Sequence, residues 1–236
     1  MQELKQSAKA FGLALSDHQL NQFEAYWDYL QDRNQVMNLT AITDRAEVME
    51  KHFLDSLAPA AVADFDGKSL IDIGTGAGFP GLPLKIAVPN LRLTLLDSLH
   101  KRIHFLEALC RRLQIEDVNC IHGRAEEWVN TPDCREGFDY AASRAVAEMN
   151  LLLELGLPYV KPGGAFFAMK TLRAEAEIRA AASAAHILGG EIETQYTYTL
   201  PGSPDAARQI VVVRKIAPTP IQYPRRFAKI QKQPLK

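Results

Sequence analysis

The stretch Ser69-Leu70-Ile71-Asp72-Ile73-Gly74-Thr75-Gly76-Ala77-Gly78-Phe79-Pro80-Gly81 decides the fold. Its first five residues form a short strand-like run, and glycines then alternate with other residues. Glycine has no Cβ atom, so the backbone of such a loop can pass close to a ligand. A helical run begins directly afterwards, at Leu82. A strand that leads through a glycine-rich loop into a helix is typical of the ligand-binding edge of an open α/β sheet.

Strand-like and helical runs alternate along the central region. The strand-like runs cover residues 69–73, 91–96, 118–121, 138–142 and 164–169, the last of them after the turn Lys161-Pro162-Gly163-Gly164. The helical runs cover 82–88, 101–113, 146–159 and 174–188. This alternation predicts right-handed crossovers and a doubly wound α/β fold with a mostly parallel sheet. Two final runs, 191–200 and 209–214, are joined by Pro201-Gly202-Ser203-Pro204-Asp205. We expect them to pair as an antiparallel hairpin at the sheet edge, which makes a seven-stranded sheet.

The first 66 residues are predicted to be helical. Ser16 and Gln19 have the spacing of a capping box. One face of the helix that follows carries Leu20, Phe23, Trp27 and Leu30. A second helix is expected after Asp44, with Val48, His52 and Leu57 among the candidates for its buried face. We therefore divide the chain into an N-terminal helical cap (1–66), a core (67–216) and a basic C-terminal tail (217–236).

Composition narrows the class of protein. The hydrophobic fraction of 47% fits an ordinary globular core. No apolar run reaches the roughly 20 residues that would span a bilayer, and the first residues lack the pattern of a signal peptide. We expect a cytoplasmic protein that is not bound to a membrane. The three cysteines show no C-x-x-C spacing, so neither a metal site nor a disulfide framework is expected.

Charge is unevenly distributed along the chain. The formal net charge of −1 does not by itself suggest a nucleic-acid partner. However, no acidic residue follows Asp205, whereas the basic residues of this end are Arg208, Arg214, Lys215, Arg225, Arg226, Lys229, Lys232 and Lys236. A segregated basic end suggests contact with phosphate groups. A solvated tail that merely aids solubility explains the same pattern equally well.

The glycine spacing separates two kinds of nucleotide site. A dinucleotide-binding loop would have the spacing G-x-G-x-x-G. Here Phe79 stands where the third glycine is needed, Gly78 comes one residue early, and Asp72 lies two residues before Gly74. This combination resembles the loop that holds the methionine end of the cofactor in class I methyltransferases. The candidate cofactor contacts in the loop are Gly74, Gly76, Gly78 and Phe79. The alternative is a glycine turn without a ligand.

Two further strand ends offer cofactor contacts. Asp97 ends the second strand and can accept hydrogen bonds from both ribose hydroxyls. Alternatively, Asp97 or Ser98 caps the helix expected at Lys101. The loop after the third strand should border an adenine, where Ala125 and Glu126 can offer backbone groups and an edge acceptor. These residues can also simply begin a helix.

The fourth and fifth strands end in basic residues. Arg144 can bind the cofactor carboxylate or an RNA phosphate, because its planar fork holds two oxygens at once. Lys170 is a similar but weaker candidate. For Arg144, the alternative is a surface arginine. We do not interpret His52, Asp55 and Ser56 as a hydrolase triad, because their spacing places them side by side on one helix without aligning a relay.

Several blocks together resemble one bacterial family, the small-subunit ribosomal RNA guanine-N7 methyltransferases, also called glucose-inhibited division protein B. The matching blocks are Asn38-Leu39-Thr40-Ala41-Ile42, His52-Phe53-Leu54-Asp55-Ser56-Leu57, Asp72 through Gly81, Leu95-Leu96-Asp97-Ser98 with Lys101-Arg102, and Ser143-Arg144-Ala145. The resemblance implies S-adenosylmethionine as cofactor and a guanine N7 in the decoding-region loop of 16S rRNA as target. It also implies that Gly74, Phe79, Ala125, Glu126 and Arg144 contact the cofactor.

The tail resembles the tails of part of that family. The similar residues are Tyr223-Pro224-Arg225-Arg226 and Pro234-Leu235, but Phe227-Ala228-Lys229 stands where a glycine-containing turn is expected. Arg225 and Arg226 are our candidate RNA contacts. Deletion of the residues after Pro220 is expected to weaken RNA binding and nearly to keep cofactor affinity.

The implied reaction needs no general base, because guanine N7 carries an in-plane lone pair and no proton. Proximity and alignment can supply most of the catalysis. We therefore nominate no catalytic base, and we expect a monomer that acts on 16S rRNA or on the small ribosomal subunit. Two rivals remain: a class I methyltransferase with a small-molecule or protein substrate, and a non-catalytic RNA-binding or assembly factor on the same fold. A nicotinamide dehydrogenase is disfavoured by the glycine spacing.

Overall fold

The computed structural model describes residues 1–144, 147–172 and 175–236, without the side chains of residues 204 and 205. Ala145, Val146 and Ala174, which belong to segments discussed above, lie outside the described residues, as do the side chains of Pro204 and Asp205 in the predicted hairpin connection.

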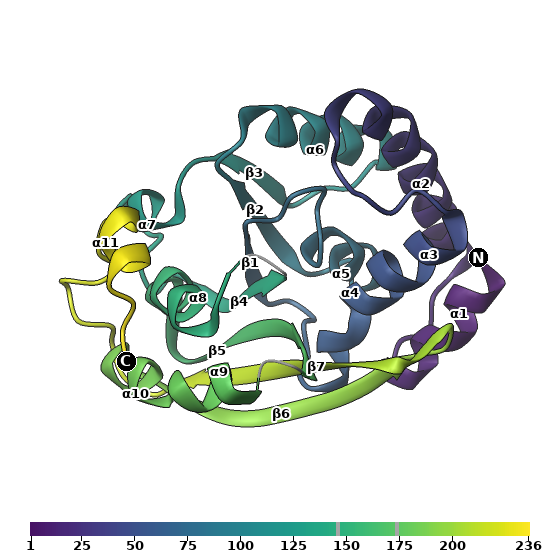
Figure 1. Ribbon diagram of the computed structural model, residues 1–236. Coiled ribbons are helices and arrows are strands. Elements are labelled where there is room, and N and C mark those ends of the chain that lie inside the picture. Colours follow the sequence, from purple (N-terminus) through teal and green to yellow (C-terminus); the bar gives the residue numbers. More distant parts are fainter. Residues whose placement is uncertain (145–146, 173–174) are drawn as a thin grey trace.

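A seven-stranded sheet forms the centre of the molecule (Figure 1). Its order is β3 (Val118–His122), β2 (Arg92–Asp97), β1 (Ser69–Ile73), β4 (Phe138–Arg144), β5 (Val160–Thr171), β7 (Ser203–Lys215) and β6 (Gly190–Leu200). The first five strands in this order pair in parallel, and β7 pairs antiparallel with both β5 and β6. The predicted doubly wound sheet with a hairpin at its edge is confirmed.

Two strands begin four or more residues before the predicted start. β5 begins at Val160, so the residues predicted as a turn before it, 161–164, lie within the strand, where β4 and β5 show a register irregularity. β7 begins at Ser203, six residues before the predicted start, so the hairpin connection shrinks to Pro201 and Gly202. In both places, strand pairing extends through residues whose local pattern favours a turn.

Side chains alternate between two hydrophobic cores, one on each face of the sheet. Leu70 and Phe167 belong to one core, whereas their neighbours Ile71 and Phe166 belong to the other. This period of two is the expected consequence of strand geometry. Because helices bury both faces, most charged side chains of β1, β2 and β4 lie near the strand ends.

Helices cover both faces. The first core includes residues of α1 (Gln2–Ala8), η1 (Lys9–Phe11), α2 (Asp17–Met37), α5 (Gly81–Ala87) and α6 (His100–Leu113). It also includes residues of a continuous helical run made of α3 (Arg45–Val48), the π-helical η2 (Met49–Leu54), α4 (Asp55–Leu57) and η3 (Ala58–Ala61). The second core or its margin includes residues of α7 (Ala125–Trp128), α8 (Met149–Gly156), η4 (Leu157–Tyr159), α9 (Glu175–Ala180) and α10 (Ala182–Ile187). The single helix expected over 174–188 is therefore divided in two. A last short helix, α11 (Phe227–Lys232), lies beside α7 in Figure 1.

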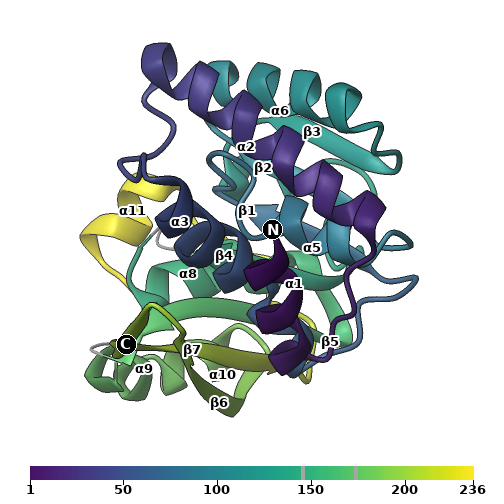
Figure 2. The same ribbon diagram turned by 90° about the vertical axis from the view of Figure 1, so that its right-hand side faces the viewer.

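The N-terminal helices are part of the main core. The predicted capping box is present, with the Gln19 N–H donating to Ser16 Oγ over 3.3 Å and the Ser16 N–H donating to Gln19 Oε1 over 2.8 Å. The predicted apolar face of α2 is buried, and α2 lies alongside α6 (Figure 2). Since these side chains join the core of the sheet, the division at residue 66 remains a sequence prediction.

The loop after β1 is held by the buried carboxylate of Asp72. Its Oδ2 accepts hydrogen bonds from Thr75 Oγ1 over 2.7 Å and from the Gly81 N–H over 2.8 Å. Its Oδ1 is buried without a hydrogen-bond partner among the described residues. Burial raises the pKa of Asp72 to about 6, although both hydrogen bonds oppose that shift.

This shift predicts a stability difference that depends on pH. The folded chain holds the Asp72 proton to a higher pH than the unfolded chain, so ionisation destabilises the fold as pH rises from about 4 to 6. Between pH 4 and pH 7, the wild type should lose about 2 kcal/mol of unfolding free energy relative to Asp72→Asn. Urea unfolding at both pH values measures this difference. Asp28→Asn, at an exposed position of α2, is the control. Parallel pH profiles for wild type and Asp72→Asn would contradict the prediction.

Candidate functional site

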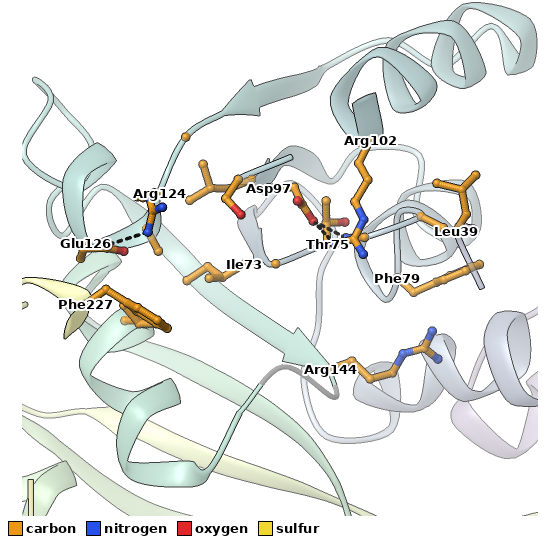
Figure 3. A pocket seen from close by; sticks show the side chains of 18 of the residues that line it. Leu39, Ile73, Thr75, Phe79, Asp97, Arg102, Arg124, Glu126, Arg144 and Phe227 are labelled. Atoms are coloured by element: carbon orange, nitrogen blue, oxygen red, sulfur yellow. Dashed lines mark hydrogen bonds and ion pairs between the residues drawn. The ribbon is translucent and has the colours of Figure 1, made fainter. Parts of the chain in front are cut away.

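A cavity of about 580 Å³ lies where β1, β2, β3 and β4 end (Figure 3). Seven of the eight predicted cofactor residues line it: Gly74, Gly76, Phe79, Asp97, Ala125, Glu126 and Arg144. The lining also includes residues that were not selected from the sequence, among them Thr40, His52, Arg102 and Phe227. The structure thus brings the ends of four strands together around one space.

Gly78 is the predicted residue that the structure does not place in the cavity lining. Its φ is +105°, and a Cβ atom there would lie 2.6 Å from the Tyr26 hydroxyl oxygen. That hydroxyl donates a hydrogen bond to the Ala77 carbonyl over 2.5 Å. The glycine therefore allows α2 to approach the back of the loop. Close packing, in place of a direct ligand contact, explains why glycine is needed at this position.

Gly76 has the opposite surroundings. Its φ is +61°, and a Cβ atom built on it would meet nothing within 4 Å. The backbone at Gly76 therefore borders open space within the cavity. This is the close backbone approach that the glycine spacing predicts.

Asp97 organises the middle of the cavity. The side chain is almost fully buried. Its Oδ2 accepts from the Gly76 N–H over 2.9 Å and from Arg102 Nη1 over 3.2 Å, and its Oδ1 accepts from the Leu99 N–H over 2.9 Å. A carboxylate offers about four lone-pair sites, so these bonds leave room for a ligand hydroxyl. The helix-cap alternative is wrong in detail, because α6 begins at His100 with Leu99 as its N-cap and no side-chain cap.

One end of the cavity is formed by the start of α7 and by the C-terminal segment. Ala125 and Glu126 are the first residues of α7, as the alternative interpretation expected. The Ala125 carbonyl accepts a hydrogen bond from the Tyr159 hydroxyl over 2.6 Å, and Glu126 is a mostly buried carboxylate 3.9 Å from Arg124 Nη1. Phe227 of α11 lies near Glu126 in Figure 3.

Aromatic and cationic groups form the other end. The rings of Phe79 and His52 stack with centroids 4.7 Å apart, and the Arg144 guanidinium lies 4.9 Å from the Phe79 centroid. Burial and the nearby Arg144 charge lower the pKa of His52 to about 4. His52 is therefore neutral at pH 7. Its Nε2 lies 2.7 Å from Thr40 Oγ1, within hydrogen-bond distance.

Arg144 is held in place by the N-terminal helical run. Its Nη1 donates to Asp55 Oδ2 over 3.0 Å and to the Lys51 carbonyl over 3.1 Å. The Asp55 carboxylate is buried and also accepts from the Tyr198 hydroxyl over 2.7 Å. Ser56 Oγ donates to the His52 carbonyl in its own helix. His52, Asp55 and Ser56 therefore act as packing and anchoring residues and form no relay.

A second cavity of about 470 Å³ adjoins the first and shares His52 and Arg144 with it. Its charged lining residues are Lys51, Arg144, Lys170, Arg208, Asp55 and Glu177. Lys170 and Arg144 thus line the same cavity, and Lys170 also pairs with Glu177 over 2.7 Å. Arg208 was seen in the sequence only as one member of the basic end.

Arg225 and Arg226 line neither cavity. Arg225 donates from its backbone N–H, Nε and Nη2 to the two oxygens of Glu154, over 2.9, 2.8 and 2.6 Å. Glu154 is fully buried in α8. Glu154 binds the Nε and Nη2 side of the guanidinium, so Arg225 forms an internal ion pair, and its role as an RNA contact stays a prediction. Arg226 is exposed at the start of α11.

Within residues 1–144, 147–172 and 175–236, no group of three or more His, Cys, Asp or Glu side chains is arranged to hold a metal ion. No helix in this same described part of the chain is long and apolar enough to cross a membrane.

The two neighbouring arginines should differ sharply in their effect on stability. Arg225→Ala removes the counter-charge of a buried carboxylate and should lower the free energy of unfolding by about 3–5 kcal/mol. Arg226→Ala removes an exposed side chain and should change it by less than about 0.5 kcal/mol. Chemical denaturation of both variants measures the difference. Equal effects would show that the pair with Glu154 does not stabilise the fold.

Comparison with known proteins supports the resemblance. The family model described as GidB, rRNA small subunit methyltransferase G, matches residues 19–201. A ribosomal RNA small subunit methyltransferase G from Alkaliphilus oremlandii is 48% identical over 99% of this chain and 98% of that protein. The protein of the same name from Bacillus subtilis is 46% identical over 95% of this chain and 94% of its own length.

The solved structures show the same fold. A SAM-dependent methyltransferase from Aquifex aeolicus matches with a TM-score of 0.57 and 13% identity, over 75% of this chain and 96% of that chain. At this identity the likeness concerns the fold alone, and it confirms the predicted methyltransferase architecture. The family match spans the glycine loop, Asp97, Arg144 and the helical run that holds Arg144. The chain therefore belongs to the GidB family, the rRNA small subunit methyltransferases G.

Proposed function

We propose that this protein transfers the methyl group of S-adenosylmethionine to N7 of a guanine in the decoding-region loop of 16S rRNA. The observation that carries this proposal is the meeting of two cavities at Arg144 and His52. One cavity has the glycine loop and the carboxylate expected of a cofactor site, and the charged lining of the other has four basic and two acidic side chains. A methyl donor and a nucleotide acceptor need such adjoining spaces.

The residues of the first cavity fit the cofactor. The backbone of Gly74 and Gly76 would hold its methionine end, since a Cβ atom at Gly76 would protrude into open space. Asp97 would bind the ribose hydroxyls, and Ala125 with Glu126 would border the adenine. Arg144, at the end of β4 where the two cavities meet, would then border the methyl group.

The target base is then placed in the second cavity. When bound, S-adenosylmethionine supplies an electrophilic methyl group on a sulfonium. The N7 lone pair forms the new N–C bond as the C–S bond breaks, and no proton moves. His52 is neutral, so it adds no positive charge beside N7. The charge of Arg144 is compensated by Asp55 and by helix carbonyls. This matters because the ring becomes positive during transfer, and an uncompensated cation would oppose it.

The finer features of the proposal follow from this chemistry. The substrate is 16S rRNA, free or within the small subunit, which places the reaction in the cytoplasm. In-line transfer to a neutral nitrogen needs neither a metal ion nor a membrane. One chain supplies every residue named for the cofactor, so we propose a monomer. Lys170 and Arg208 line the second cavity and are our candidates for contacts with RNA phosphates, although Lys170 pairs with Glu177 and Arg208 Nε lies 3.4 Å from Asp55 Oδ1.

The proposal predicts label on one guanine. Small subunits that lack the modification should accept labelled methyl from S-adenosylmethionine, and the label should map to a base cleaved by chemistry specific for N7-methylguanine. With no general base to titrate, the maximal rate should vary by less than about twofold between pH 6 and pH 9. Transfer to small molecules or proteins without RNA would contradict the substrate. RNA binding without transfer would favour the assembly-factor alternative.

Arg144 should be needed for alignment. Arg144→Ala removes the group between the two cavities and leaves Asp55 without its partner. We expect the rate of transfer at saturating substrates to fall by about 100-fold or more, as small misplacements of reacting groups can cost that much. Circular dichroism would verify that the variant is folded. Arg214→Ala, which breaks an exposed pair with Glu193 and a 3.4 Å hydrogen bond to the Gly163 carbonyl, both away from the two cavities, is the control. Unchanged transfer by Arg144→Ala would remove this residue from the site.

A further inference from the structure

The segment from Pro220 to Leu235, which we call the C-terminal strap, is folded against the body of the protein. At its start, Arg135 Nη2 donates to the carbonyls of Pro220 and Tyr223, over 3.3 and 2.5 Å. At its end, Asn150 Nδ2 donates to the Leu235 carbonyl over 2.6 Å. Ile230, within α11, is fully buried. The strap therefore contacts the described fold along its whole length.

The strongest anchor of the strap is built into α8. Glu154 is fully buried, and every hydrogen bond recorded for its carboxylate in the described part of the chain comes from Arg225. A buried carboxylate without a partner is strongly unfavourable. Burial of the Glu154 carboxylate in α8 is therefore favourable only when the strap supplies Arg225 as its partner. Leu155, the next residue of α8, lines the first cavity, so the anchor lies beside the cofactor site.

Phe227 follows the anchor by two residues and lines the first cavity together with Leu155, Ala125 and Glu126. Figure 3 shows its ring at the Glu126 end, away from the end formed by Phe79 and Arg144. The ribose-binding candidate Asp97 lies between the two ends. An adenine that extends from this ribose toward Glu126 would reach the Phe227 ring.

We propose that the C-terminal strap is part of the cofactor site and that Phe227 forms an aromatic wall against the adenine. This inference rests on the proposed function for the identity of the cofactor. Stacking of a planar purine on an aromatic ring stabilises the complex, both through the contact between the rings and because water is excluded from their faces. The role replaces the RNA contact that the basic composition of the tail suggested. It also reverses the expectation that deletion after Pro220 nearly keeps cofactor affinity.

The C-terminal strap lies beyond the part of the chain that the family model matches, which ends at residue 201. In the sequence, Phe227-Ala228-Lys229 stands where a glycine-containing turn was expected. The structure accounts for the difference, since these residues begin a helix that directs one aromatic ring toward the cavity.

Calorimetry with the full-length chain tests the proposal. The probes are S-adenosylhomocysteine and 5′-methylthioadenosine, which share the adenine and ribose but differ in the amino-acid end. Phe227→Ala should weaken both by a similar factor of about 10, which is within the range for loss of one base–aromatic stack. Phe227→Leu, which keeps apolar bulk, should lose less. Gln231→Ala, at an exposed position of α11, should bind like the wild type.

Enzyme kinetics separate the strap's role in cofactor binding from a role in RNA binding. Phe227→Ala should raise the KM for S-adenosylmethionine and leave kcat and the KM for ribosomal subunits nearly unchanged. Unaltered affinity for both probes, or weaker subunit binding with normal probe binding, would overturn the proposal. A loss seen with S-adenosylhomocysteine alone would also overturn it, because the adenine would not be the group contacted. If the wild type bound neither probe, the cofactor assignment itself would fail, a result that no Phe227 variant can mimic.

Discussion

The carboxyl edge of the sheet depends on one buried carboxylate, that of Asp72. By accepting hydrogen bonds from Thr75 and Gly81, it closes the turn between β1 and α5 from the inside. The closed turn then directs the N–H groups of Gly74 and Thr75 to the Leu96 carbonyl, which joins the loop to the end of β2. That junction brings Asp97 next to Gly76. The energetic cost of burying Asp72, visible in its raised pKa, is therefore accepted at the position that sets the geometry of the whole cleft.

Arg144 has a comparable role between the N-terminal helices and the sheet. It extends from the end of β4 to carbonyls and a carboxylate of the helical run that contains Lys51 and Asp55. Because the same guanidinium borders both cavities, the N-terminal helices form one wall of the site and are not a separate appendage. Phe79 and His52 stack in the same place, so a loop residue and a helix residue are fixed together. The packing contacts in this region would therefore also position the reacting groups.

The sequence allowed the sheet, its hairpin edge and seven of the residues that line the first cavity to be predicted, because these features depend on local patterns. Glycine spacing, strand periodicity and acidic residues at strand ends are all visible within a few positions. The C-terminal segment was different. Its basic composition suggested a solvated or RNA-bound tail, yet Arg225 pairs with a carboxylate 71 residues earlier in the chain. The sequence around each residue does not indicate its partner, because Glu154 resembles an ordinary helical acid and Arg225 resembles its exposed neighbour Arg226. The same limit applies to Gly78, whose role depends on a tyrosine from a distant helix.

The pairing of Glu154 with Arg225 also constrains how the protein is made. Translation proceeds from the N-terminus, so α8 emerges well before residue 225. During that interval the acid on the buried face of α8 has no counter-charge, so burial of its ionised form in the final, dry environment is unfavourable. The second core is therefore expected to close late, when the strap arrives and neutralises Glu154. The second core of a nascent chain at that stage would remain partly hydrated. A product that terminates before residue 225 would stay in this state and would be susceptible to cellular proteolysis.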